Sequence, residues 1–210
     1  MDLPAGNFSE WLRAMRAALR GDAGMDVACG DCVGCCTSSY YIKVRPHETR
    51  ALAAIETIAP EHLEPAPGPR GEWLMGFDER GHCRMFDGGC RIYADRPDTC
   101  RTYDCRVFAA AGMQAGDRPV INERIARWRF SYPTARDREE QQAVAAAASF
   151  LRRHPVRFPS GRIPSRPAEI AVLAVKTYEV FLGASPDGEA AAQAVIAAAR
   201  SFDGTRERVA

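Results

Sequence analysis

This sequence of 210 residues has no long apolar run, only two lysines, and no excess of charge of either sign. Nothing approaches the run of about 18 apolar residues that a bilayer-spanning helix needs, so we expect no membrane association. The 28 basic and 27 acidic side chains give a net charge of +1, which argues against a protein built to neutralise nucleic-acid phosphates. A hydrophobic content of 46% excludes a disordered chain and is typical of a domain with a buried core.

Cysteine is absent from residues 106–210 but frequent before them. Cysteines that merely fill a core would scatter along the chain, so their confinement to one region needs another explanation. We take all eight as candidate metal ligands: Cys29, Cys32, Cys35, Cys36, Cys83, Cys90, Cys100 and Cys105.

Disulfide bonds are the first alternative to metal binding. The first eleven residues show no basic segment followed by an apolar stretch, so we expect no secretory signal and a cytoplasmic protein with reduced thiols. Cys35 and Cys36 are adjacent and cannot readily bridge to each other, whereas closely spaced Cys-x-x-Cys repeats present several thiolates to one ion. We therefore favour metal or cluster ligation as the role of the eight cysteines, with disulfides and inert thiols as alternatives.

Local signals predict a helix-rich α+β fold. A helix over residues 7–20 begins with Asn7 and Glu10 in a capping-box-like arrangement and ends at Gly21, and another begins at Thr134 with Asp137 three residues later. We predict further helices at 46–58, 165–183 and 185–202, strands at 40–45 and 128–132, a loop at 60–71, a hairpin formed by 72–77 and 82–86, and little regular structure at 87–106.

These elements predict two regions. Residues 1–132 would form a metal-binding domain, with a small cysteine-organised core, a short hairpin and an N-terminal helix. Residues 133–210 would form a C-terminal three-helix region packed on it, with alanine-rich faces that suit close packing.

The cysteine spacing favours an iron–sulfur cluster over a structural zinc site. Three cysteines at intervals of two residues followed by a remote fourth are typical of four-iron clusters in bacterial ferredoxins, whereas structural zinc sites usually show two knuckles. Gly30 and Gly34 permit the backbone to wrap around the metal. We therefore expect a 4Fe-4S cluster bound by Cys29, Cys32, Cys35 and one of Cys90, Cys100 or Cys105. The other thiols would form a second site, act as reactive groups or pack beside the cluster.

Each of the four downstream cysteines is followed by an arginine. Two tetrathiolate centres would together carry about −4, and four guanidinium groups could offset this charge. We therefore predict that the cofactor is flanked by Arg84, Arg91, Arg101 and Arg106, with compositional bias as the alternative explanation. Among other polar residues, His82 could be a ligand, while Asp95, Asp98 and Asp104 are better explained as loop-capping residues.

The segment CGDCVGCC, followed by GHCRMFDGGCRIYADRPDTCRTYDC, resembles the YkgJ-type cysteine-cluster family, described as a zinc- or iron-chelating domain. The resemblance covers about residues 25–108. It implies a bound metal, and the occurrence of similar domains in the flagellin lysine N-methylase group hints at modification of protein side chains. It assigns no reaction to this chain.

We therefore expect a metal-binding protein that carries an iron–sulfur cluster in a redox or protein-modifying role. The alternatives are a non-enzymatic zinc module whose helical face binds a protein partner, and a metal delivery or storage protein. No nucleic-acid or membrane partner is expected.

Overall fold

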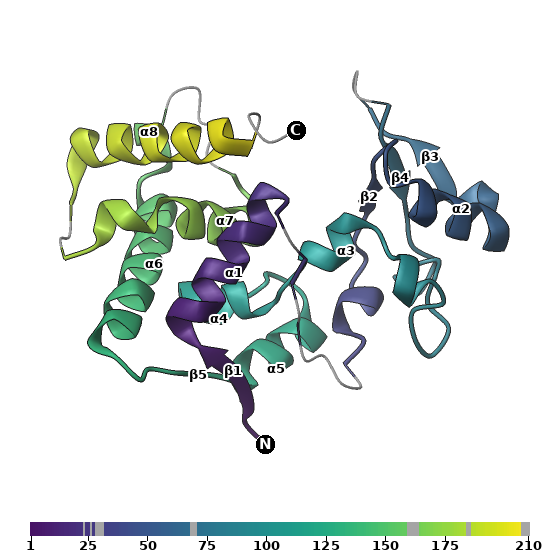
Figure 1. Ribbon diagram of the computed structural model, residues 1–210, viewed down its shortest axis with the longest axis horizontal. Coiled ribbons are helices and arrows are strands. Elements are labelled where there is room, and N and C mark those ends of the chain that lie inside the picture. Colours follow the sequence, from purple (N-terminus) through teal and green to yellow (C-terminus); the bar gives the residue numbers. More distant parts are fainter. Residues whose placement is uncertain are drawn as a thin grey trace. The chain divides into compact units, whose positions relative to one another are not determined.

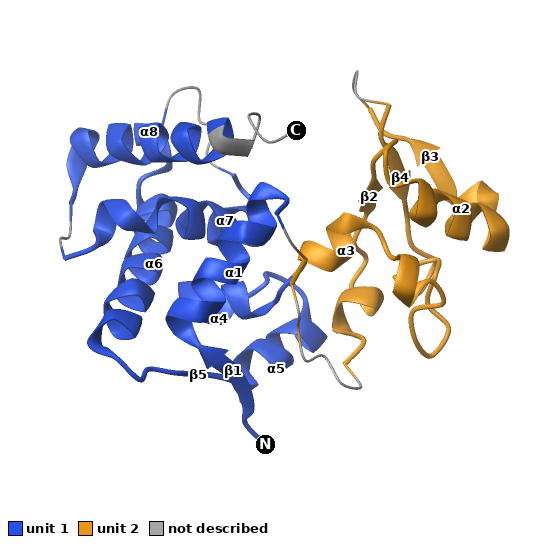
Figure 2. Cartoon of the chain, in the orientation of Figure 1, with its two compact units in different colours: residues 1–23, 104–210 blue, residues 24–103 orange. Residues whose placement is uncertain are grey.

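The computed structural model describes the chain except for residues 23, 26, 28–31, 68–70, 159–163, 184–185 and 207–210, and the side chains of 205–206. The described residues form two compact units, coloured separately in Figure 2. Unit 1 comprises residues 1–23 and 104–210, and unit 2 comprises residues 24–103. Unit 2 is thus inserted into the chain of unit 1, a division that differs from the predicted boundary after residue 132.

Unit 1 combines helices with one pair of strands (Figure 1). The strands β1 (Leu3–Asn7) and β5 (Trp128–Ser131) are parallel, with Leu3 opposite Trp128. A strand at 128–132 was predicted, but its partner was not, because β1 comes from the other end of the chain. The helices are α1 (Phe8–Arg20), α4 (Arg106–Ala111), α5 (Pro119–Arg127), α6 (Ala135–Arg153), α7 (Pro167–Thr177) and α8 (Gly188–Arg206).

The two helices with the clearest caps begin where the sequence predicts. The Asn7 side chain accepts a hydrogen bond from the backbone N–H of Glu10, and α1 ends at Gly21 with a φ of 93°. Helix α6 begins with a capping box in which Thr134 and Asp137 satisfy each other's backbone N–H groups. Both predictions are confirmed. A helix cap can be predicted from sequence because it depends on residues within one helical turn.

The core of unit 1 lies where α6 packs against α1, α4 and α7. The rings of Phe8, Phe108 and Phe150 are almost fully buried there. Helix α6 also buries Ala147 and Ala148 completely, so that neighbouring backbones approach closely, as the alanine-rich sequence predicts.

Other helix predictions for unit 1 need correction. Helix α7 stops at Thr177, and residues 178–181 form a 3₁₀ turn instead of continuing the helix. Helix α8 begins at Gly188 and continues past Asp203, where the predicted helix stops. The buried Phe202 and an ion pair between Lys176 and Asp203, at 2.7 Å, hold this last turn in place. Helices α4 and α5 were not predicted.

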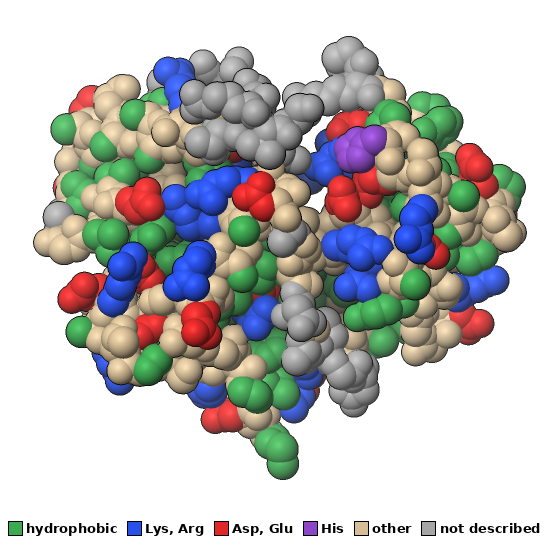
Figure 3. All heavy atoms as spheres, viewed as in Figure 1, with side chains coloured by type: hydrophobic (Ala, Val, Ile, Leu, Met, Phe, Trp, Pro, Cys, Tyr) green, Lys and Arg blue, Asp and Glu red, His purple; other side chains and the backbone are tan. Residues whose placement is uncertain are grey.

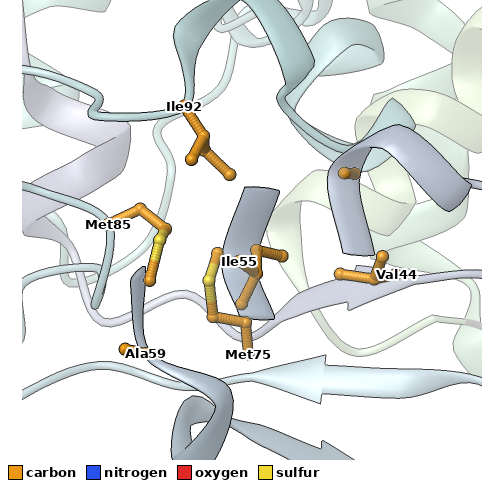
Figure 4. Packing of buried hydrophobic residues seen from close by; sticks show 7 residues of the cluster. Val44, Ile55, Ala59, Met75, Met85 and Ile92 are labelled. Carbon is orange, nitrogen blue, oxygen red and sulfur yellow. The ribbon is translucent and has the colours of Figure 1, made fainter. Parts of the chain in front are cut away.

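Unit 2 contains a small antiparallel sheet, two helices and long connecting loops. The strands lie in the order β2 (Ile42–Val44), β4 (Trp73–Met75) and β3 (Leu63–Pro65). Helix α2 (Thr49–Ile58) and the short α3 (Asp98–Thr102) accompany them. The apolar core is a cluster that gathers side chains from β2, α2, β4 and the loop after it, as Figure 4 shows: Val44, Ala51, Ile55, Ala59, Met75, Met85 and Ile92.

Four predictions for unit 2 are wrong in detail. The predicted hairpin is reduced to one bridge, Phe77 with Cys83, because β4 pairs with β2 and β3 instead. The predicted loop contains β3, which tolerates Pro65 because it is an edge strand. Helix α2 starts three residues later than predicted, and α3 lies in a region expected to be irregular.

The surface matches the balanced charge of the sequence. Acidic and basic side chains are interspersed over each unit on the face drawn in Figure 3. In the part of the chain that the structure describes, every helix is too short or too polar to cross a bilayer.

Candidate metal centre

Six of the eight predicted ligands belong to described parts of unit 2. Cys32 precedes a 3₁₀ turn, Gly34–Thr37, which carries Cys35 and Cys36. The downstream cysteines lie on two further segments: Cys83 and Cys90 in the loop after β4, and Cys100 on α3. Cys29 and the neighbouring Gly30 lie outside the described residues, so their predicted roles stay predictions.

Backbone hydrogen bonds bring the upstream and downstream cysteine segments together. The N–H of Cys83 donates to the carbonyl of Cys36 at 2.7 Å, and the Sγ atoms of Cys35 and Cys36 are 3.9 Å apart. Cys90 pairs with Phe86 through a second isolated bridge. Segments almost fifty residues apart in sequence thus meet at one place.

Five thiols of unit 2 lie close enough to affect one another's ionisation. A hydrogen bond with Cys36 lowers the pKa of Cys35 to about 7, and the same bond raises the pKa of Cys36. Burial raises the pKa of Cys83 and of Cys90, and raises the pKa of Cys100 to about 12. For each of these last three, negative charge on other cysteines raises the pKa further. A bound cation would relieve that repulsion.

Backbone N–H groups point at several of these sulfur atoms. Hydrogen bonds from the N–H of Met85 and of Ile92 lower the pKa of Cys83 and of Cys90, partly offsetting the effect of burial. In each case the donor lies two residues after the cysteine. Such N–H···S bonds stabilise thiolates and tune metal–thiolate centres.

Helix α3 is held in place by residues that the sequence did not single out. The carboxylate of Glu48 accepts hydrogen bonds from the backbone N–H of Arg45, at 2.6 Å, and from that of Asp98, at 2.5 Å. The hydroxyl of Thr99 donates to the carbonyl of Lys43 at 2.7 Å. Glu48 therefore joins the start of α2 to the start of α3 and fixes the helix that carries Cys100. No local motif announces this contact, because its partners are fifty residues apart.

Cys105, the eighth predicted ligand, belongs to unit 1. Its sulfur accepts a hydrogen bond from the indole Nε1 of Trp128 at 3.2 Å. Beside it, the fully buried carboxylate of Asp104 accepts hydrogen bonds from the indole of Trp11 at 2.7 Å and from the guanidinium of Arg106. This network ties β5, α1 and the start of α4 to one another within unit 1.

The four arginines that follow cysteines occupy different environments. Arg84 and Arg91 are exposed. The guanidinium of Arg101 donates to the carbonyls of Arg96 and Ala94, and that of Arg106 is paired with Asp104 in unit 1.

Arg96 is an arginine near the thiols that the Cys-Arg pattern did not identify. Its charge lowers the pKa of Cys35, Cys90 and Cys100, although other effects are larger for each of them. Its side chain is held by the carbonyl of Tyr93 and lies over the Tyr93 ring, 4.0 Å from the centroid. Its place in the Arg-Pro-x2-Cys segment of the family-like motif was a usable signal.

The other polar candidates have structural partners. The ring of His82 packs edge-on against Phe86. Asp95 pairs with Arg50 at 2.6 Å, and Asp98 lies 3.7 Å from Arg45.

No disulfide joins any two of the seven described cysteines. Within the described residues, no three Cys, His, Asp or Glu side chains form a closed metal site. The donor set nevertheless fits a thiophilic metal, because soft thiolates select zinc, copper(I) and iron–sulfur clusters.

Residues 28–124 match the model of the CxxCxxCC family, whose description is "Putative zinc- or iron-chelating domain". This confirms the resemblance seen in the cysteine motif. The matched segment includes all eight cysteines and extends beyond residue 108, through α4 and into α5 of unit 1. No curated protein and no solved structure matches the chain significantly. The family match supports metal binding by this segment.

Proposed function

We propose that unit 2 binds its metal as an iron–sulfur cluster through thiolates that the fold gathers from both cysteine segments. The observation that carries this proposal is the convergence of Cys35 and Cys36 with Cys83, Cys90 and Cys100, joined by the hydrogen bond from Cys83 to Cys36. N–H donors aimed at sulfur are typical of iron–sulfur clusters, and the long, uneven gaps between the downstream cysteines differ from the two short knuckles of a structural zinc site.

Cys29, Cys32 and Cys35 are the first three proposed ligands, because their spacing of two residues is the part of the motif closest to a ferredoxin, and Cys90 or Cys100 is the proposed fourth. Arg96 offsets part of the negative charge. Cys105 is left out of this set because it belongs to unit 1.

The chemistry that such a cluster supplies when bound is one-electron transfer. The residues of this chain would hold it, donate hydrogen bonds to sulfur and limit its contact with water. A redox role follows directly, and a protein-modifying role would need a partner surface in addition.

Anaerobic purification with metal analysis tests the proposal. We expect iron and acid-labile sulfide together with a broad absorption near about 400 nm that bleaches on reduction. Colourless protein containing stoichiometric zinc would overturn the cluster and support the second candidate, a structural zinc module. That candidate is favoured by the small apolar core of unit 2, which a zinc ion would reinforce.

A further inference from the structure

Two segments of unit 2 approach each other closely at Gly81 and Ser39. The N–H of Ser39 donates to the carbonyl of Gly81 at 2.9 Å, and two residues further on Cys83 donates to Cys36 at 2.7 Å. A Cβ built on Gly81 would overlap the Oγ of Ser39 and lie 3.6 Å from its Cβ. A side chain at residue 81 would therefore force the Ser39 hydroxyl to turn away, and would have to adopt a positive φ that glycine tolerates best.

Both residues of this contact have left-handed backbone conformations. Gly81 has a φ of 79°, and Ser39, with a φ of 54°, is alone among the described non-glycine residues in having a positive φ. Such a conformation is unfavourable for serine and persists only where the surroundings enforce it. Here the conformation is held by the hydrogen bond from the N–H of Ser39 to the carbonyl of the buried Gly81.

The turn that presents Gly81 is itself rigid. The carboxylate of Asp78 accepts hydrogen bonds from the backbone N–H groups of Arg80 and His82, at 2.9 and 2.8 Å. The backbone of Asp78 closes the same turn, since its carbonyl accepts from the N–H of Gly81 and its N–H donates to the carbonyl of His82. Displacement of Gly81 therefore moves the whole turn and Cys83 with it.

We propose that Gly81 and Ser39 form a register pin, a backbone contact that positions Cys83 against Cys35 and Cys36 and thereby sets the metal affinity of the site. The inference rests on the proposed metal-binding function. Neither residue is a metal ligand, and both act through the cysteines that follow or precede them by two or three positions.

Gly88 provides a matched control. Like Gly81, it lies two residues before a cysteine, and its own φ is positive, at 66°. A Cβ at Gly88 would meet nothing within 4 Å. Substitution at either glycine forces a side chain into the left-handed region, and only substitution at Gly81 pushes against Ser39. Comparison of the two positions isolates the contact.

The experiment is a Co²⁺ titration of chelator-treated, reduced full-length protein, with sulfur-to-cobalt absorption and competition by a chelator as readouts. We expect Gly81→Ala to weaken binding about tenfold and Gly81→Val about a hundredfold, the range found for residues that orient ligands. Gly88→Ala and Gly88→Val should stay within about twofold of wild type. Ser39→Gly should restore most of the affinity lost in Gly81→Ala, because it removes the opposing Oγ.

Equal affinities for the Gly81 and Gly88 variants, or no recovery in the Ser39→Gly, Gly81→Ala double variant, would overturn the register pin while leaving metal binding intact. Wild-type protein that retains no metal after anaerobic purification and binds no Co²⁺ would overturn the proposed function as well. Circular dichroism of each metal-free variant separates the two effects, because the helices of unit 1 should be unchanged throughout. If Gly81→Val alone fails to fold, the alanine pair and its rescue decide the result.

Discussion

In unit 1 several helices enclose an apolar core rich in buried aromatic rings, whereas in the described part of unit 2 short strands and two helices cover a cluster of seven buried residues. In unit 1 the long helices α1 and α6 begin with side-chain caps and pack on each other. Unit 2 depends on single hydrogen bonds between loops, such as those from Cys83 to Cys36 and from Ser39 to Gly81. Small domains with so little core usually need a metal or disulfides to remain folded. We therefore expect metal binding to contribute more to the stability of unit 2 than to that of unit 1.

Removal of the metal should give the largest effect, and it should destabilise unit 2 while leaving unit 1 unchanged. We expect a chelator, under reducing conditions, to lower hydrogen-exchange protection of residues 32–39 and 78–92 by on the order of a hundredfold, because the binding free energy of such sites is folding free energy. Protection of α6 should be unchanged. Equal losses in both units would contradict the comparison.

Substitution of individual cysteines should affect the metal content differently in the two units. Cys83→Ser removes a thiolate whose backbone links the two cysteine segments, and we expect metal content to fall by about tenfold or more. Cys105→Ser removes a thiol of unit 1 that is bonded to Trp128, and most of the metal should be retained. Metal analysis of the two purified variants provides the measurement. A comparable loss in Cys105→Ser would show that the centre draws ligands from both units.

Substitution of a large core residue of unit 1 by a small one should destabilise unit 1 and leave the metal content unchanged. Phe150 is almost fully buried, and its ring lies 5.5 Å from that of Phe181. Phe150→Ala should lower the free energy of unfolding of unit 1 by about 3–5 kcal/mol, through lost burial and a cavity. Denaturant titration monitored by helix content gives this value, and the metal content of the folded variant should match that of wild type. Loss of metal would show that the two units fold as one.

The sequence predicts local features better than long-range ones, even within unit 1. Helix α6 was found from Thr134 and Asp137 because a cap is specified by residues in one turn. The strand pair β1–β5 was missed because its partners lie at opposite ends of an inserted unit, and no local pattern encodes such pairing.

The candidate site shows the same limit. Spacing alone singled out the cysteines and the family, since both are linear motifs. It could not show that Arg101 binds carbonyls and Arg106 binds Asp104, nor that Arg96 lies near the thiols, because the direction of each side chain depends on the fold. The contact of Gly81 with Ser39 was equally hidden, since it requires two loops to meet.

The smallest predicted effect concerns pH and is confined to unit 1. The carboxylate of Asp137 accepts hydrogen bonds from the side chain and backbone of Thr134 and, at 3.0 Å, from the backbone N–H of Ser9. These bonds, that from the Thr134 side chain above all, hold the pKa of Asp137 well below its usual range. Because the folded pKa is depressed, the stabilisation is complete above the unfolded pKa of about 4 and is lost as the pH falls below it.

Asp137→Asn should therefore lower the melting temperature of unit 1 by roughly 2–4 °C at pH 7, and the difference from wild type should shrink toward pH 3. Thermal unfolding across this range, with the exposed Glu139→Gln on the same helix as control, measures the effect. A difference that stays constant with pH would assign the contribution of Asp137 to packing and not to its charge. Metal content should be the same in all three proteins, because the capping box stabilises a unit that does not depend on the thiolate cluster.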